Sequence, residues 1–141
     1  MNFWLMKAKF VVDTNVLISA ALSKGVPFQV IEYLSKKNAL VFSKETINEL
    51  ASRIMKPKFD KYVSIEYREL YVNNLILSSE VVIIDNLIQG CRDKDDDKFL
   101  ETALKSESQA IISGDKDLLV MHPFQGVEII TPQEFSIKYL Q

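Results

Sequence analysis

The sequence contains few of the residues that build thiol or imidazole sites. Its 141 residues include one cysteine, Cys91, and one histidine, His122. A single cysteine excludes a disulfide within the chain and fits a reducing compartment, so we expect a cytoplasmic protein. A single histidine argues against a histidine-based zinc site and against histidine-based catalysis. The chemistry of this chain must therefore come from other side chains.

Long apolar runs and an excess of basic residues are also missing. No apolar run reaches the roughly 18 residues that a membrane helix needs, and the first residues lack a signal-peptide pattern, so we expect no membrane association. The 17 basic residues are outnumbered by 19 acidic ones, which gives a net charge of −2. Nucleic-acid binders usually carry a basic excess. Binding of nucleic acid would therefore need a local basic patch, metal ions or a partner.

The apolar residues that are present point to one folded α/β domain. They make up 48% of the 141 residues, which argues against disorder and suits a single domain over residues 1–141. Residues 1–8 are expected to form an N-terminal extension. Strands are predicted at residues 9–12, 39–42, 81–84, 110–113 and 127–130, and helices at 14–22, 27–36, 44–54, 65–77, 95–105, 116–120 and from 132 onward. This alternation predicts a parallel sheet in an α/β sandwich, with sites at the carboxyl ends of the strands.

Acidic side chains follow the ends of the predicted strands. Asp13 comes directly after the first strand, and Asp115 follows the strand at 110–113, so a parallel sheet brings both to one edge. Asp96 opens the helix at 95–105 on its inward face and can point to the same edge. Clustered carboxylates repel one another unless a cation compensates, and Mg²⁺ and Mn²⁺ prefer oxygen ligands. Such ions can activate water for phosphodiester hydrolysis.

Each of these acids also has a purely structural interpretation. Asp13 suits a helix N-cap, and Gly114-Asp115 suits an ordinary turn into a helix. The aspartates at 95–97 suit the positive end of a helix dipole. Glu49 lies opposite the apolar face of its predicted helix, so its spacing favours a solvated ion pair with Arg53, four residues later. Spacing alone therefore supports Asp13 and Asp96 better than it supports Glu49.

Basic side chains gather after the helix predicted at 44–54. They are Arg53, Lys56, Lys58 and Lys61, with the aromatic residues Phe59 and Tyr62 between and beside them. Cations interleaved with aromatic rings are candidates for contact with RNA. The alternative interpretation is a solvated helix end.

Four stretches of the chain resemble the PIN-domain family. They are VVDTNVL at residues 11–17, NEL at 48–50, DKDDDKFLE at 93–101 and ISGDKDLL at 112–119. Residues 53–59, together with the last two stretches, are similar to a branch of that family: the VapC-like toxin components of toxin–antitoxin systems. Taken in order, the matching segments extend from about residue 9 to residue 135.

This resemblance implies a fold, an activity and a set of site residues. The fold is a three-layer α/β/α sandwich around a parallel sheet of about five strands, and the activity is endonucleolytic cleavage of RNA with Mg²⁺ or Mn²⁺. The implied partners are an RNA substrate, an antitoxin protein and a second copy of the chain. The implied catalytic and metal-binding residues are Asp13, Glu49, Asp96 and Asp115, supported by Asn15 and Ser113, with Asp97 as the alternative third acid and Asp117 as an assistant to Asp115.

Two other functions are compatible with parts of this pattern. In a haloacid-dehalogenase-like phosphatase, Asp13 would be the nucleophile and Gly114-Asp115 a metal-binding loop. That chemistry needs an acid two residues after the nucleophile, where this chain has Asn15, and the chain is short for it. In a PIN-like scaffold, the domain would bind RNA or an antitoxin with little or no catalysis. The retained acids argue against a scaffold.

Overall fold

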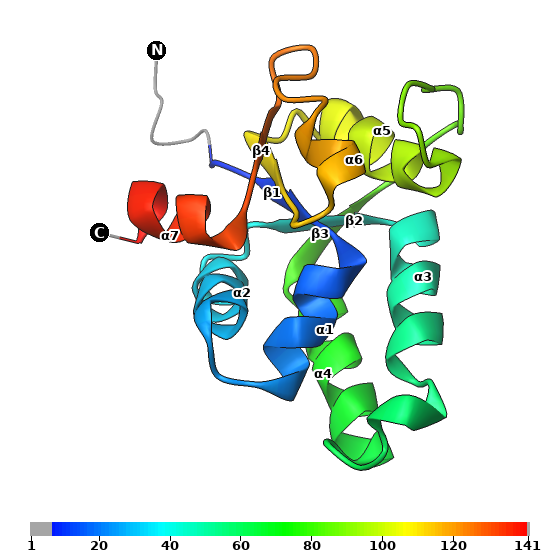
Figure 1. Cartoon of the computed structure of the whole chain (residues 1–141), viewed down its shortest axis with the longest axis vertical. Coiled ribbons are helices and arrows are strands. Elements are labelled where there is room, and N and C mark those ends of the chain that lie inside the picture. The colour runs from blue at the N-terminus through cyan, green and yellow to red at the C-terminus, as the bar shows by residue number, and fades with distance from the viewer. Residues whose placement is uncertain (1–6, 141) are drawn as a thin grey trace.

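A central parallel sheet organises residues 7–140, the part of the chain that the computed structural model describes (Figure 1). Its strands are β1 (Phe10–Val12), β2 (Leu40–Ser43), β3 (Ser79–Val82), β4 (Ala110–Ile112) and β5 (Glu128–Ile130). They lie in the order β3-β2-β1-β4-β5, and each neighbouring pair is parallel. The predicted parallel sheet is confirmed. Residues 1–6 of the expected N-terminal extension lie outside the described residues.

Helices cover both faces of the sheet. They are α1 (Thr14–Leu22), α2 (Val26–Lys36), α3 (Lys44–Ile54), α4 (Ile65–Leu77), α5 (Asp97–Ser106), α6 (Lys116–Leu119) and α7 (Pro132–Tyr139), with 3-10 turns η2 (Pro57–Phe59) and η3 (Lys94–Asp96). Helices α5 and α6 lie on one face, and the others lie on the opposite face (Figure 1). The predicted three-layer α/β/α sandwich is therefore confirmed. Within residues 7–140, none of the helices is both long enough and apolar enough to cross a bilayer.

Alternate residues of the central strands contribute to two separate cores. Val11 and Ile111 pack with Phe99 in the core beneath α5. Phe10 points to the other face, where its ring meets the ring of Phe135 edge-on with the centroids 5.1 Å apart. Because both faces are buried, the strands are continuous apolar runs. This explains why the sequence revealed them.

Strand β3 begins two residues earlier than the strand predicted at 81–84. It pairs with β2 from Ser79 to Val82 at the edge of the sheet. Two of the four apolar side chains that suggested the strand are poorly covered, since Val81 is 51% exposed and Ile83 is 85% exposed. At an edge, backbone pairing with the neighbouring strand fixes the bounds more strongly than side-chain burial does. The apolar run therefore marked the region of the strand but not its ends.

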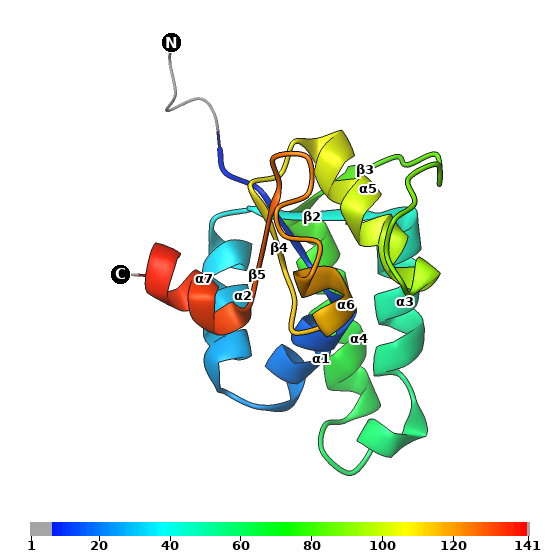
Figure 2. The same cartoon turned by 45° about the horizontal axis from the view of Figure 1, so that its top comes forward.

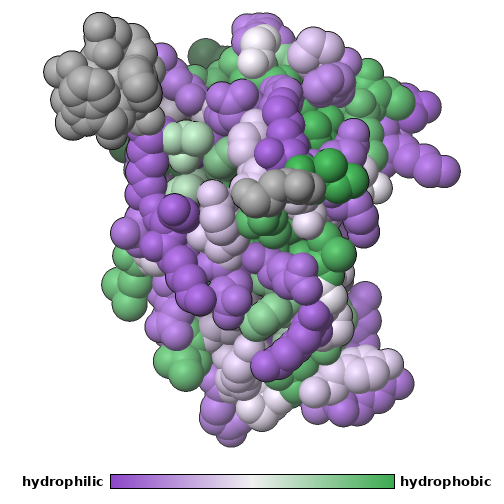
Figure 3. Space-filling view, turned by 90° about the vertical axis from the view of Figure 1, so that its left-hand side faces the viewer, coloured by the Kyte–Doolittle hydropathy of each residue, from purple (hydrophilic) through white to green (hydrophobic). Residues whose placement is uncertain are grey.

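The surface does not present one dominant chemical character on the face that carries α2 and α7. Hydrophilic side chains there separate several apolar patches (Figure 3). Over the whole sequence, 17 basic and 19 acidic residues nearly balance. A binding surface must therefore be recognised from local groups of side chains.

The strand order creates a switch point between β1 and β4. From β1 the chain proceeds to β2 and β3 on one side, and it returns to β4 on the other side of β1. Open parallel sheets bind their ligands at the carboxyl ends of such neighbouring strands. Figure 2 shows α6 close to the start of α1 at this edge. A pocket opens there, and its lining includes Asp13, Gly114 and Asp115.

A loop beside α5 is anchored by one buried carboxylate. Glu101 is 3% exposed, and its two oxygens accept hydrogen bonds of 2.5–3.1 Å from the four successive backbone N–H groups of residues 85–88. Burial alone would raise the pKa of Glu101, but these four donors together hold it below its usual value. The charged form of Glu101 thus fixes the segment that leads from β3 towards η3.

Replacement of Glu101 by glutamine is expected to lower the free energy of unfolding by about 2 kcal/mol, because one amide oxygen cannot serve four donors. The lowered pKa means that the carboxylate contributes fully above its unfolded pKa of about 4.3, and that this contribution is lost as pH falls through the folded pKa. The difference in the free energy of unfolding between the native chain and E101Q should therefore become smaller as the pH falls. Urea unfolding across this pH range measures it, with Glu107→Gln at an exposed position as the control. Equal neutral-pH stability of the two variants would contradict the anchoring role.

Candidate active site

A serine bridges the carboxyl ends of β1 and β4. Ser113, which is fully buried, donates a hydrogen bond of 2.7 Å from its hydroxyl to Oδ2 of Asp13. The same hydroxyl accepts a hydrogen bond of 2.9 Å from the backbone N–H of Asp115. One side chain therefore fixes both acids relative to each other. The structure brings Asp13, Ser113 and Asp115 together at the switch point, where the sequence placed them.

Asp13 occupies the N-cap position of α1, but its side chain forms no capping hydrogen bond. The side chain is 4% exposed and turned towards Ser113. Burial raises the pKa of Asp13, the Ser113 hydroxyl and the nearby Asn15 N–H oppose this, and the charges of Asp115 and Glu49 raise it further. A simple helix cap does not account for a buried carboxylate among other carboxylates. The cost of this arrangement indicates a site.

Asp96 joins this group from the start of α5. It also occupies an N-cap position without capping, and it is 7% exposed. Its Oδ2 atom is buried without a hydrogen-bond partner among the described residues. Burial and then the neighbouring Asp115 carboxylate raise the pKa of Asp96 well above its ordinary value, and Asp13 adds to the effect. A buried acceptor without a donor is costly, so this atom is suited to a positively charged ligand.

The donor set of Asp13, Asp96 and Asp115 fits a hard divalent cation in its chemistry. All three supply oxygen, and the unpartnered Oδ2 of Asp96 is available for coordination. Within residues 7–140, no three acidic, histidine or cysteine side chains stand in an arrangement that could already hold one ion. Mg²⁺ is commonly held by one or two carboxylates, with waters and substrate phosphates completing its shell. The paired acids Asp96 and Asp115 meet that smaller requirement.

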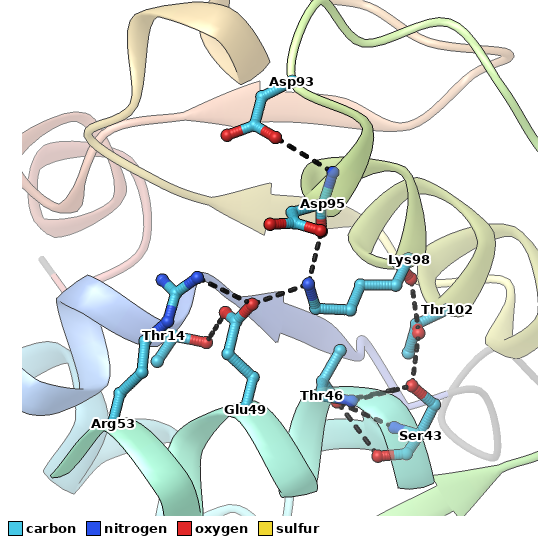
Figure 4. A network of polar contacts seen from close by, with 9 residues as sticks. All are labelled: Thr14, Ser43, Thr46, Glu49, Arg53, Asp93, Asp95, Lys98 and Thr102. Atoms are coloured by element: carbon cyan, nitrogen blue, oxygen red, sulfur yellow. Dashed lines mark hydrogen bonds and ion pairs between the residues drawn. The ribbon is translucent and has the colours of Figure 1, made fainter.

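Glu49 lies in a different electrostatic environment from these three acids. Figure 4 shows its contacts with Thr14, Arg53 and Lys98. Its side chain is 10% exposed and accepts a hydrogen bond from the hydroxyl of Thr14. Its Oε2 atom lies 2.6 Å from Nζ of Lys98 and 3.2 Å from Nη2 of Arg53. Two cations and a hydroxyl therefore hold Glu49, whereas Asp96 keeps an unpartnered oxygen.

The local spacing around Glu49 gave an incomplete description. The expected pair with Arg53 is present, but the carboxylate is covered rather than solvated. Contacts between α3 and both α1 and α5 explain the difference, because these helices cover a face of α3 that an isolated helix would leave in water. The structure places Glu49 near the other acids. The resemblance to the PIN-domain family implied this position, whereas the residue spacing within α3 did not.

The predicted supporting residues have separate positions. The Asp97 carboxylate accepts the backbone N–H of Cys91 at 2.9 Å, which turns it to the neighbouring loop. Asp117 pairs with Arg92 at 2.7 Å, and its backbone N–H donates to Asp115 at 2.9 Å. Exposed Asn15 lines the pocket that contains Asp13 and Asp115. The basic candidates Arg53, Lys56 and Lys58 line a second pocket, which also includes Asn15.

Two residues in contact with Glu49 were absent from the predicted site. Lys98 is 15% exposed and also donates to the carbonyl of Asp95, and Thr14 is almost fully buried. The available signals were weak. A lysine within an acidic helix start looks like ordinary charge balance, and a threonine after a strand looks like a helix start. Their role depends on the placement of α3, which the sequence did not reveal.

Comparisons with known proteins agree with this architecture. A family model described as PIN domain matches residues 9–117. An uncharacterised protein of Methanocaldococcus jannaschii, MJ1680, is 32% identical to the chain, with 92% of this chain and 90% of that protein covered. The crystal structure of PAE2754 from Pyrobaculum aerophilum superposes with a TM-score of 0.62 at 15% identity, covering 93% of this chain and 88% of the other. The last of these supports the fold alone.

Proposed function

This chain belongs to the PIN domain family, whose members are generally nucleases that use divalent metal ions, and from that premise we propose that it is a Mg²⁺- or Mn²⁺-dependent endoribonuclease. The observation that carries the proposal is the group formed by Asp13, Asp96 and Asp115. These acids come together from the segments after β1 and β4 and from the start of α5. Asp13 and Asp96 occupy helix N-cap positions, but their side chains form no capping hydrogen bonds. The carboxylates repel one another, so a divalent cation would be stabilised among them. Such a cation could in turn bind a phosphate ester.

The proposed reaction is hydrolysis of a phosphodiester in the RNA backbone. Asp13, Asp96 and Asp115 would hold a divalent cation, which would supply Lewis acidity for water activation and positive charge for the phosphate. A water oxygen forms a bond to phosphorus while the bond to the 3′-oxygen breaks in line. The products are a 5′-phosphate and a 3′-hydroxyl.

The residues of the chain contribute orientation and charge. Ser113 fixes the orientation of Asp13 and receives the Asp115 N–H, so the two acids act as one unit. Thr14 and the cations on Glu49 hold that carboxylate at the rim of the group, where it positions the attacking water. Preorganised charge of this kind lowers the barrier because it requires no rearrangement during the reaction.

Removal of divalent ions is expected to abolish the activity. With EDTA, cleavage of a labelled RNA should fall to background, and added Mg²⁺ or Mn²⁺ should restore it, because the acids alone would repel the phosphate. Gel analysis with end-group determination gives the rate and the termini. Cleavage that persists in EDTA contradicts the proposal. Release of phosphate from small phosphomonoesters without RNA cleavage would instead favour the phosphatase alternative.

The wider biological role is also a proposal. We propose that the chain is the toxin component of a toxin–antitoxin system, with an antitoxin protein and a second copy of itself as partners. The support is the similarity of residues 53–59, 93–101 and 112–119 to that branch of the family.

A further inference from the structure

A small pocket lies beside the acids and has a chemistry of its own. Its volume is about 250 Å³, below the range of pockets that take whole drug-sized ligands. We call it the cation pocket. Its lining comprises the apolar Ile18, Leu22 and Phe59, the polar Asn15 and Ser19, and the cations Arg53, Lys56 and Lys58. An apolar floor with a charged rim suits a flat ring that carries an attached anion.

The cation pocket is continuous with the pocket of the acids. Asn15 and Ser19 line both of them. These two residues lie four apart on α1, so they stand on one face of the helix. Arg53 provides a second link, since its guanidinium lies 3.2 Å from Glu49 while its side chain lines the cation pocket. A ligand bound at the acids can therefore extend past Asn15 and Ser19 into the cation pocket.

The charge of the cation pocket differs from that of the chain. Three cations and no acids stand among the described residues that line it, although the net charge of the chain is −2. The Lys58 ammonium lies 5.2 Å from the centre of the Phe59 ring. A base that contacted this ring would thus place its phosphate within reach of a cation. Cations combined with aromatic rings are the usual means of holding single-stranded nucleic acid.

We propose that the cation pocket receives one base of a single-stranded RNA substrate, next to the phosphate that lies at the acids. This inference rests on the proposed ribonuclease function and adds a subsite to it. Phe59 contacts the face of the base, Asn15 and Ser19 offer hydrogen bonds to its edge, and Lys56 and Lys58 contact phosphates. Only an unpaired, unstacked base can enter such a pocket, so the subsite selects single strands over duplexes.

Binding without cleavage tests this subsite. Fluorescence anisotropy with a short labelled single-stranded RNA measures affinity for the native chain and for F59L, K56Q/K58Q and K36Q, with Ca²⁺ in place of Mg²⁺ or Mn²⁺ to offset the charge of the acids. Lys36 is an exposed lysine at the end of α2, so K36Q is the matched control. F59L should weaken binding about fivefold or more through lost stacking. K56Q/K58Q should weaken it about tenfold and reduce the salt slope by roughly 1.4, whereas K36Q should bind like the native chain.

The outcomes separate the subsite from the proposed function. Thermal unfolding shows whether F59L is folded, and K56Q/K58Q changes only exposed side chains. If the pocket variants bind as tightly as K36Q, the subsite is wrong, even where Mg²⁺-dependent cleavage persists. If pocket-dependent binding occurs without cleavage, the subsite stands and the ribonuclease proposal fails. Equal affinity for duplex RNA, or pocket-dependent binding of an acidic peptide in place of RNA, would overturn the proposal.

Discussion

Asp13→Asn is expected to reduce the rate of Mg²⁺-dependent RNA cleavage by about 100- to 1,000-fold while leaving the fold intact. Asparagine keeps the shape and can still receive the Ser113 hydroxyl at its amide oxygen. It removes the charge, however, from the acid that directly follows β1. The acids at the switch point would then hold a cation more weakly. Cleavage measured under single-turnover conditions over a range of Mg²⁺ concentrations separates lost affinity from a lost chemical step.

The activity of D13N should fall, but its stability should stay the same or rise. The pKa of Asp13 is raised in the fold by burial and by nearby carboxylates, so its ionised form costs stability above the unfolded pKa of about 3.9. D13N should therefore unfold at the same or a higher temperature than the native chain at neutral pH. Asp85→Asn is the matched control, because Asp85 is exposed and pairs with Lys105 away from the site. A loss of activity that accompanies a lower unfolding temperature would instead indicate a structural role for Asp13.

The fold and part of the site could be predicted because they follow from short-range patterns. Strands buried on both faces are continuous apolar runs, and the acids after β1 and β4 must meet when those strands are parallel neighbours. Asp13 and Asp115 are therefore close for reasons that the chain order already contains. Asp96 needed a helix face in addition, and its burial in the structure agrees with that face.

The rest of the fold and of the site could not be predicted, because it depends on contacts between segments that are far apart in the sequence. Glu49 is covered because α1 and α5 lie beside α3, and no spacing within α3 encodes that contact. The edge strand β3 has its bounds set by β2 and not by its own side chains. The cation pocket combines α1 with the turn after α3, so its basic residues resembled a solvated helix end in the sequence. Local patterns predict elements better than they predict which surfaces those elements cover.

A buried arginine supports the turn that carries the cation pocket, and its removal is expected to have the largest effect on stability. Arg68 is fully buried in α4. Its guanidinium donates to the carbonyls of Ile54 and Lys56 at 2.9 and 3.3 Å and lies 2.6 Å from the Asp60 carboxylate. These carbonyls belong to the end of α3 and the following turn, where helices leave acceptors without partners. One side chain therefore fixes the path of residues 54–60.

Arg68→Met is expected to lower the free energy of unfolding by about 3–5 kcal/mol, because it keeps the volume but leaves buried acceptors unpaired. Asp60→Asn should cost less, since the amide oxygen can still accept from the Arg68 guanidinium, which also keeps the carbonyls of Ile54 and Lys56. Urea unfolding compares the two variants. RNA binding by the folded fraction of R68M should also weaken, because Lys56, Lys58 and Phe59 lose their support. If R68M is as stable as D60N, water satisfies the carbonyls and the arginine does not hold the turn.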